Sequence, residues 1–188
     1  MPTIPFKNDF YSYIIPSNKD QLINHCLNAK KLEGNLSWGD NCLIEKENIN
    51  QEGFFEILQP TIQQFLLEIT NIPFQYHIDE LWRNTYRQGY HQEIHHHSPA
   101  DISFVIFLND YVENDAKFYF YNERSRVTSI IWKKLCQSNQ FYMNEFWNMT
   151  PEKGSIILFP SHMLHGVSPH KSVHTRTTVS GNILIDKI

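Results

Sequence analysis

Along the first 73 residues, apolar side chains recur mainly at the spacing of helices. One helix is expected to open at Ser17 and Asp20, which resemble a capping box. A second is expected from about Gly53 to Thr70, and Pro60 should kink it or split it in two. A short strand over Phe10–Ile15 precedes both helices. We therefore expect residues 1–73 to form an N-terminal support of helices and a strand.

From residue 74 the period of the apolar positions changes to two, which is typical of strands. The expected strands are Phe74–Tyr86, Asp101–Leu108, Ala116–Tyr121, Ser155–Phe159 and His174–Ile185. The segment 123–149 interrupts this rhythm and is interpreted as an insertion or lid. The pattern predicts a mainly β fold with flanking helices, in which an antiparallel sandwich or barrel occupies residues 74–188.

The composition of the chain argues against several classes of protein. The chain has 188 residues, of which 41% are hydrophobic and 19% charged, so we expect one folded domain over 1–188. The net charge is −4 without a dense basic face, which argues against nucleic acid as a partner. Three dispersed cysteines favour a reducing compartment, and no signal peptide or membrane-spanning segment is recognised. A cytoplasmic protein is expected, in the host cytoplasm if a phage encodes it.

Histidines cluster twice along the chain: four of the ten lie between residues 91 and 97, and four more between 162 and 174. Side chains of an extended segment alternate between faces, so His95 and His97 share a side while His96 points away. Two imidazoles at this spacing can hold one divalent ion, although tandem histidines can equally be idle in solvent. The spacing makes His95 and His97 candidate metal ligands.

The second histidine cluster follows a buried strand that ends at Pro160. His165 comes five residues later and can face the same cavity as the first pair. Farther on, Arg176, Thr178 and Ser180 alternate with apolar or small residues and therefore share one strand face. An arginine beside hydroxyls on an otherwise apolar sheet indicates a buried carboxylate receptor.

Together these residues resemble a known family. The first half of the resemblance consists of Trp82, Asn84, Tyr86 and Gly89, then His95 and His97, then Ser103 with Phe107, Leu108 and Asn109. The second half consists of Lys153, Gly154 and Ser155, then Leu158 to Ser161, then His165, Gly166 and Val167, and finally Arg176, Thr178 and Asn182. The pattern is similar to 2-oxoglutarate/Fe(II) oxygenases, in particular the short prolyl-hydroxylase-like forms of marine bacteria and tailed phages.

The resemblance implies a double-stranded β-helix, or jelly-roll, with a cupin-like core and Fe(II) in its mouth. It further implies 2-oxoglutarate as cosubstrate, O₂ as oxidant, and release of succinate and CO₂ as a substrate is hydroxylated. By this resemblance His95 and His165 bind the metal, and Arg176 binds the far carboxylate of 2-oxoglutarate with help from Thr178 and Tyr86. Phe107 stands where prolyl hydroxylases often have a tyrosine.

The chain departs from the family pattern at the third metal ligand. His97 occupies the position at which the family has an aspartate, and three neutral ligands leave the metal site one charge more positive. Asp101, four residues later, is the alternative ligand, but its spacing fits less well. We therefore predict His97 as the third ligand.

Two other function classes compete with the oxygenase. One is a three-histidine cupin enzyme that does not need 2-oxoglutarate, and the other is a non-catalytic jelly-roll binding or structural protein. His162, Gln88, Glu93 and the 123–149 segment are further candidates for contact with the metal surroundings or the substrate. The sequence does not identify the substrate, and an exposed strand edge would permit a homodimer.

Overall fold

The structure is a computed structural model that describes residues 9–33, 44–70, 72, 74–123, 130–131, 134 and 145–187. Two helices and ten strands are assigned among these residues. The helices are α1 (Lys19–Asn28) and α2 (Phe54–Ile69). The strands are β1 (Ser12–Ile14), β2 (Glu45–Asn48), β3 (Gln75–Tyr86), β4 (Gln92–His95), β5 (Ile102–Phe107), β6 (Phe118–Tyr121), β7 (Phe146–Met149), β8 (Ile156–Pro160), β9 (His165–Val167) and β10 (Arg176–Lys187).

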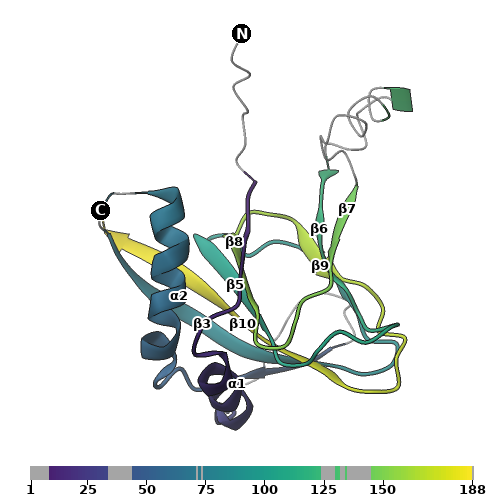
Figure 1. Ribbon diagram of the computed structural model, residues 1–188, viewed down its shortest axis with the longest axis horizontal. Helices are drawn as coiled ribbons and strands as arrows, with labels where there is room; N and C mark the ends of the chain where they lie inside the picture. Colours follow the sequence, from purple (N-terminus) through teal and green to yellow (C-terminus); the bar gives the residue numbers. More distant parts are fainter. Residues whose placement is uncertain are drawn as a thin grey trace.

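The strands form two antiparallel sheets. The larger sheet has the order β1-β8-β5-β10-β3-β2, and the smaller has the order β4-β9-β6-β7. In Figure 1 the helices lie beside the larger sheet, while β6, β7 and β9 lie away from them. The predicted class, mainly β with flanking helices, is confirmed.

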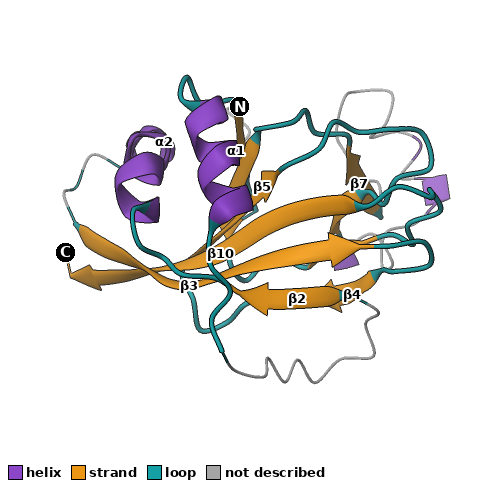
Figure 2. Cartoon of the chain, turned by 90° about the horizontal axis from the view of Figure 1, so that it is seen from below, coloured by secondary structure: helices purple, strands orange, loops and turns teal. Residues whose placement is uncertain are grey.

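The central strands of the larger sheet are buried on both faces. Alternate side chains of β5, such as Phe104 and Ile106, pack into a cluster with α1 and α2, which cover that face in Figure 2. Their neighbours Val105 and Phe107 pack into a second cluster with Phe118 and other residues of the smaller sheet. A central strand covered on both sides therefore has a continuous apolar sequence, as β5 and β8 have.

Some sequence predictions at the N-terminal elements were wrong. Pro60 lies inside one continuous helix, α2, so the helix is not split in two. The N-cap of α1 is Asn18 without a side-chain capping bond, so the expected capping box does not form. The Asn18 amide instead donates to the carbonyl of Ile57 on α2, which ties the two helices together.

The sequence pattern did not indicate three strands of the smaller sheet, β4, β7 and β9, or β2 of the larger one. β4 and β9 have four and three residues, too few to establish a period. β7 lies at the end of the predicted insertion, where it pairs with β6. Most of the remaining insertion lies outside the described residues.

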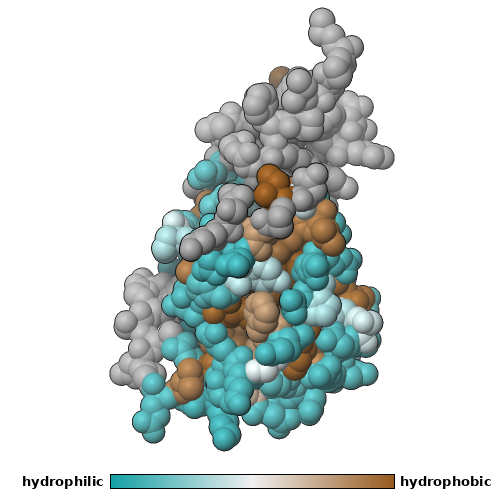
Figure 3. All heavy atoms as spheres, turned by 90° about the vertical axis from the view of Figure 1, so that its left-hand side faces the viewer, coloured by the Kyte–Doolittle hydropathy of each residue, from teal (hydrophilic) through white to brown (hydrophobic). Residues whose placement is uncertain are grey.

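On the described part of the face in Figure 3, hydrophobic atoms occur in separate patches among hydrophilic ones. Dispersed apolar side chains of this kind are usual on protein surfaces and do not by themselves mark an interface. Within the described ranges, no helix is both long and apolar enough to span a membrane.

Candidate active site

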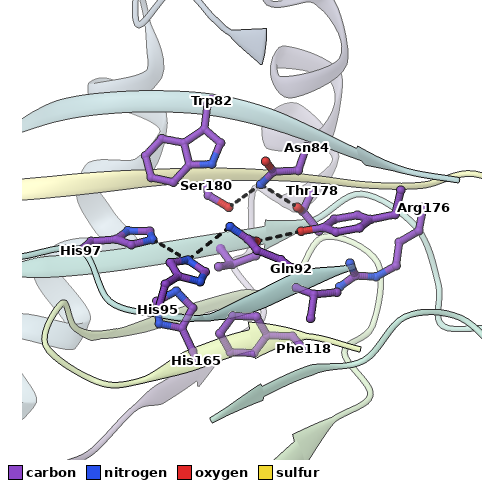
Figure 4. A pocket seen from close by; sticks show the side chains of 13 residues that line it. Trp82, Asn84, Gln92, His95, His97, Phe118, His165, Arg176, Thr178 and Ser180 are labelled. Carbon is purple, nitrogen blue, oxygen red and sulfur yellow. Dashed lines mark hydrogen bonds between the residues drawn. The ribbon is translucent and has the colours of Figure 1, made fainter. Parts of the chain in front are cut away.

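A small cavity opens between the two sheets. Its wall combines the side chains that the sequence singled out with several apolar ones. The lining residues are Trp82, Asn84, Tyr86, Gln92, His95, His97, Val105, Phe118, His165, Val167, Arg176, Thr178 and Ser180. In Figure 4 three histidines gather at one end of this cavity and Arg176 extends from the other.

Two strands of the smaller sheet bring the histidines together. His95 ends β4 and pairs in register with His165 of β9, so the two rings meet at 4.4 Å between centroids. His97, two residues on, presents its ring to the same side, and the exposed His96 points away, as alternation predicts. Ring nitrogens of the three histidines lie within 4.8 Å of one another.

Each of these histidines has an oxygen beside its Nδ1 atom. The oxygen is the carbonyl of Glu93 for His95, at 2.7 Å, and the carbonyl of Met163 for His165, at 2.8 Å. For His97 it is the Asn182 side-chain oxygen, at 2.8 Å. A carbonyl oxygen only accepts, so each Nδ1 carries the hydrogen and each Nε2 keeps its lone pair for a metal.

The spacing of the Nε2 atoms fits a metal ion. Those of His95 and His97 lie 3.0 Å apart, and neither carries a hydrogen that the other could accept. Two such lone pairs repel each other unless a cation lies between them. Two nitrogens, each ~2.1 Å from one ion and at right angles to each other, would be ~3.0 Å apart. The donor set therefore fits a divalent transition metal.

Burial keeps His97 and His165 neutral. Burial, followed by the neighbouring His95, lowers the pKa of His97 from 6.5 to about 4. Burial lowers the pKa of the fully enclosed His165 well below its usual range. At neutral pH a metal ion would not have to displace protons from these two ligands.

Arg176 at the other end of the cavity is buried and incompletely paired. Its guanidinium carbon lies 5.1 Å from the Tyr86 ring and 5.4 Å from the Phe107 ring. Its Nη1 atom has no hydrogen-bond partner among the described residues. Burial lowers the Arg176 pKa, while Tyr86 and the buried Asp115 act in the opposite direction. A guanidinium stays charged in proteins, so a bound anion would supply the missing hydrogen-bond partner of Arg176.

A ladder of polar groups connects the two ends along β10. Thr178 and Ser180 face the cavity, and the Asn84 amide of β3 lies 3.5 Å from the first hydroxyl and 3.2 Å from the second. The strand alternation expected from the sequence, with Arg176, Thr178 and Ser180 on one face, is therefore observed. Val179 between them is fully buried in the helical cluster on the opposite face.

Gln92 is a cavity residue that the sequence analysis missed. Its side chain accepts a hydrogen bond from the Tyr86 hydroxyl and approaches the His95 Nε2 atom, both at 3.2 Å. Simple alternation would place residues 92 and 95 on opposite faces, but the pairing of β4 with β9 shifts register between them. That irregularity leaves no mark in the sequence.

The other candidates lie elsewhere. Asp101 accepts a hydrogen bond from the Ile185 backbone at 2.8 Å and is not part of the histidine cluster. Gln88, Glu93 and His162 have exposed side chains. None of these four lines the cavity.

Comparison with protein families decides which of the competing classes applies. A family model described as "Putative 2OG-Fe(II) oxygenase" matches residues 80–182, more than half of the chain. The chain belongs to the 2OG-Fe(II) oxygenase family. Members of this family use Fe(II), 2-oxoglutarate and O₂, so the chain is a 2-oxoglutarate-dependent oxygenase. No curated protein matches the chain.

Solved structures show the same fold. An oxidoreductase of the 2OG-Fe(II) oxygenase family from Burkholderia pseudomallei is 10% identical with a TM-score of 0.61, and the alignment covers 93% of this chain and 84% of that one. HygX from Streptomyces hygroscopicus, with nickel, 2-oxoglutarate and hygromycin B bound, is 8% identical with a TM-score of 0.59, covering 92% and 82%.

A third similar structure is the viral collagen prolyl hydroxylase of Paramecium Bursaria Chlorella virus-1 as its 2-oxoglutarate complex. It is 13% identical with a TM-score of 0.56, and the alignment covers 94% of this oxygenase and 96% of that chain. At sequence identities this low, the structural similarity supports only a shared fold. The two facing antiparallel sheets are thus the double-stranded β-helix that the resemblance implied.

Proposed function

We propose that this oxygenase hydroxylates its substrate at a mononuclear Fe(II) site held by His95, His97 and His165. We further propose that Arg176 binds the far carboxylate of 2-oxoglutarate, assisted by Thr178 and Tyr86. In this proposal the third ligand is a neutral histidine instead of a carboxylate. Asp101 has no place in it, because its carboxylate already binds the Ile185 backbone.

One observation supports the proposal: three histidine rings with ligand nitrogens within 4.8 Å of one another share a single cavity with an incompletely paired, buried guanidinium. A metal ion completes the first group, and a carboxylate completes the second. A ligand with a chelating keto acid at one end and a carboxylate at the other satisfies both at once. 2-Oxoglutarate is such a ligand.

When bound, Fe(II) and 2-oxoglutarate supply the oxygen chemistry, in which O₂ and 2-oxoglutarate are consumed and succinate and CO₂ are released. The residues of the chain have simpler tasks. His97 and His165 would offer lone pairs without first losing protons, and Arg176 would fix the orientation of the cosubstrate by charge and hydrogen bonds. Phe118, Val105 and Val167 line the cavity between these groups and limit the access of water.

The whole chain, residues 1–188, is proposed to work as a single domain. Residues 1–73 would support the oxygenase core of 74–188 from outside, with 123–149 inserted in it. The cluster that joins α1 and α2 to β5, β8 and β10 supports this view, because neither helix could bury its apolar face alone. 2-Oxoglutarate is the small-molecule partner, and we propose a cytoplasmic location.

The test is an anaerobic titration of metal-free protein with Fe(II) and then with 2-oxoglutarate, followed by visible absorption. The proposal expects a charge-transfer band that requires both additions, since the band reports a keto acid chelated to Fe(II). Tight Fe(II) binding without any such band would overturn it and favour a three-histidine enzyme that does not use 2-oxoglutarate. No binding of Fe(II) would favour a non-catalytic protein.

A further inference from the structure

Three buried polar residues from the family-like motifs do not line the cavity. Ser103 of β5, Ser161 after β8 and Asn182 of β10 are each at most 7% exposed. The structure brings all three to the back of His97, on the side away from its Nε2 atom. Buried polar groups in such a position need a reason, because burial without hydrogen bonds costs free energy.

Asn182 is the centre of this group. Its Oδ1 atom lies 2.8 Å from His97 Nδ1 and 3.0 Å from the Ser103 hydroxyl. The Ser103 oxygen lies 2.8 Å from the hydroxyl of Ser161, so the latter can donate in turn. On its other side, Asn182 Nδ2 lies 3.3 Å from a carboxylate oxygen of Glu80.

These contacts determine which way the amide points. A carboxylate only accepts, so the Asn182 amide must direct its N–H group to Glu80 and its oxygen to His97. The oxygen can only accept, so His97 must carry its hydrogen on Nδ1. The opposite tautomer would place the hydrogen on Nε2, where it would block the metal. Glu80 therefore acts on His97 through Asn182, across strands β3 and β10.

His97 differs from the other two histidines in this respect. His95 and His165 are fixed by the backbone carbonyls of Glu93 and Met163, which no substitution removes. The acceptor for His97 is a side chain, so its tautomer depends on the residue at position 182. This is also the ligand that replaces the family's carboxylate.

We propose that Asn182 is a positioning residue for the third metal ligand: it selects the Nδ1–H tautomer of His97 and turns Nε2 toward the metal. Ser103 and Glu80 hold the amide in the required orientation. The inference rests on the proposed function, in which His97 binds the metal. It explains how a neutral ligand can replace aspartate here, since partners of ligating histidines typically change metal affinity by about 10- to 100-fold when removed.

Two measurements test the inference. Nitrogen NMR of the histidine rings reports the His97 tautomer in metal-free protein, and Co(II) titration followed by its d–d absorption reports affinity without 2-oxoglutarate. In Asn182→Leu we expect His97 to lose its single tautomer and Co(II) to bind about 10- to 100-fold more weakly. Asn109→Leu is the control and should change neither, because this asparagine accepts a hydrogen bond from the Thr177 backbone of β10 and does not line the cavity.

A rescue variant separates positioning from general damage. In Asn182→Asp combined with Glu80→Gln, the amide and the carboxylate exchange places, so an acceptor again faces Nδ1, and Co(II) affinity should return. If N182L keeps the Nδ1–H tautomer and wild-type affinity, the inference is overturned. If N182L does not fold, Asn182→Ser takes its place with the same criteria. The tautomer is measured in metal-free protein, so it does not depend on the proposed function. If the proposed function is wrong, the wild-type protein itself lacks the keto-acid band.

Discussion

The two ends of the cavity differ in how completely their polar groups are paired. At the histidine end, all three Nδ1 atoms have oxygen partners, and the Asn182 side chain is itself held from two sides. At the arginine end, Arg176 Nη1 and the Asn84 side-chain oxygen are buried without hydrogen-bond partners among the described residues. One end is organised before any ligand arrives, whereas the other is left for a ligand to complete.

This difference indicates how the binding energy is divided. A pre-organised metal site loses little conformational entropy when the ion binds, so its geometry is set by the fold. The unsatisfied Nη1 atom of Arg176 costs free energy in the ligand-free protein, and a carboxylate would recover it. Affinity for the metal and affinity for the dicarboxylate should therefore respond to different substitutions.

The largest effect is expected from His165→Ala. His165 is fully enclosed and is one of the three proposed metal ligands, so Fe(II) affinity should fall by at least about 100-fold, with loss of the charge-transfer band. His162→Ala, three residues earlier on an exposed side chain, is the control and should bind as wild type. Equal Fe(II) affinities in calorimetry would show that the metal lies elsewhere.

Arg176→Met should lower the affinity for 2-oxoglutarate without changing the affinity for the metal. Removing a buried charge that pairs with a carboxylate costs about 2–5 kcal/mol, which corresponds to a 2-oxoglutarate affinity at least about 30-fold lower. Metal affinity should stay near wild type, because no ring nitrogen of the cluster contacts Arg176. The keto-acid band, titrated with 2-oxoglutarate at saturating Fe(II), measures the affinity for 2-oxoglutarate, and calorimetry with Fe(II) alone measures the affinity for the metal. Arg176→Lys tests whether charge alone is enough, and we expect only partial recovery.

The pH dependence of stability reports on the histidine end without any metal. His97 titrates near 6.5 when unfolded and at about 4 in the fold, so between these values the unfolded chain binds more protons. The free energy of unfolding should thus fall as pH drops from about 6.5 to 4, by at most about 3 kcal/mol from His97.

Urea unfolding in EDTA at several pH values measures this slope. His97→Asn removes the titrating group and should flatten the curve over the same window. His165, whose pKa is also lowered by burial, would account for the slope that remains. An identical slope in wild type and H97N would contradict the environment described for His97.

The smallest effect is expected from Thr178→Val, which removes one hydroxyl from the arginine end with little change of shape. A hydrogen bond to a charged ligand contributes about 1.5–3 kcal/mol, less when Arg176 remains, so we expect 2-oxoglutarate affinity to fall about 3- to 10-fold. Thr177→Val, its neighbour on the opposite strand face, should leave the titration unchanged. If both variants behave alike, the ladder along β10 does not contact the cosubstrate.

Strand alternation made most of the site predictable from sequence. It placed His95 with His97, and Arg176 with Thr178 and Ser180, because period two holds wherever a strand is regular. It failed at Gln92, where β4 is irregular, and it could not reveal Asn182 behind His97, since 85 residues separate them. Long-range side-chain hydrogen bonds follow no local pattern, and strands as short as β9 have no period to detect.

The continuity of β10 has a consequence for the spacing between the two ends of the cavity. Arg176 and Asn182 belong to one strand, which pairs with β3 along its length and with β5 from Thr178 to Ile183, so their separation along it is set by the fold. Six residues of strand measure about 20 Å. The strand therefore holds Arg176, the proposed carboxylate anchor, and Asn182, the proposed support of His97, at a fixed spacing whichever ligand is bound.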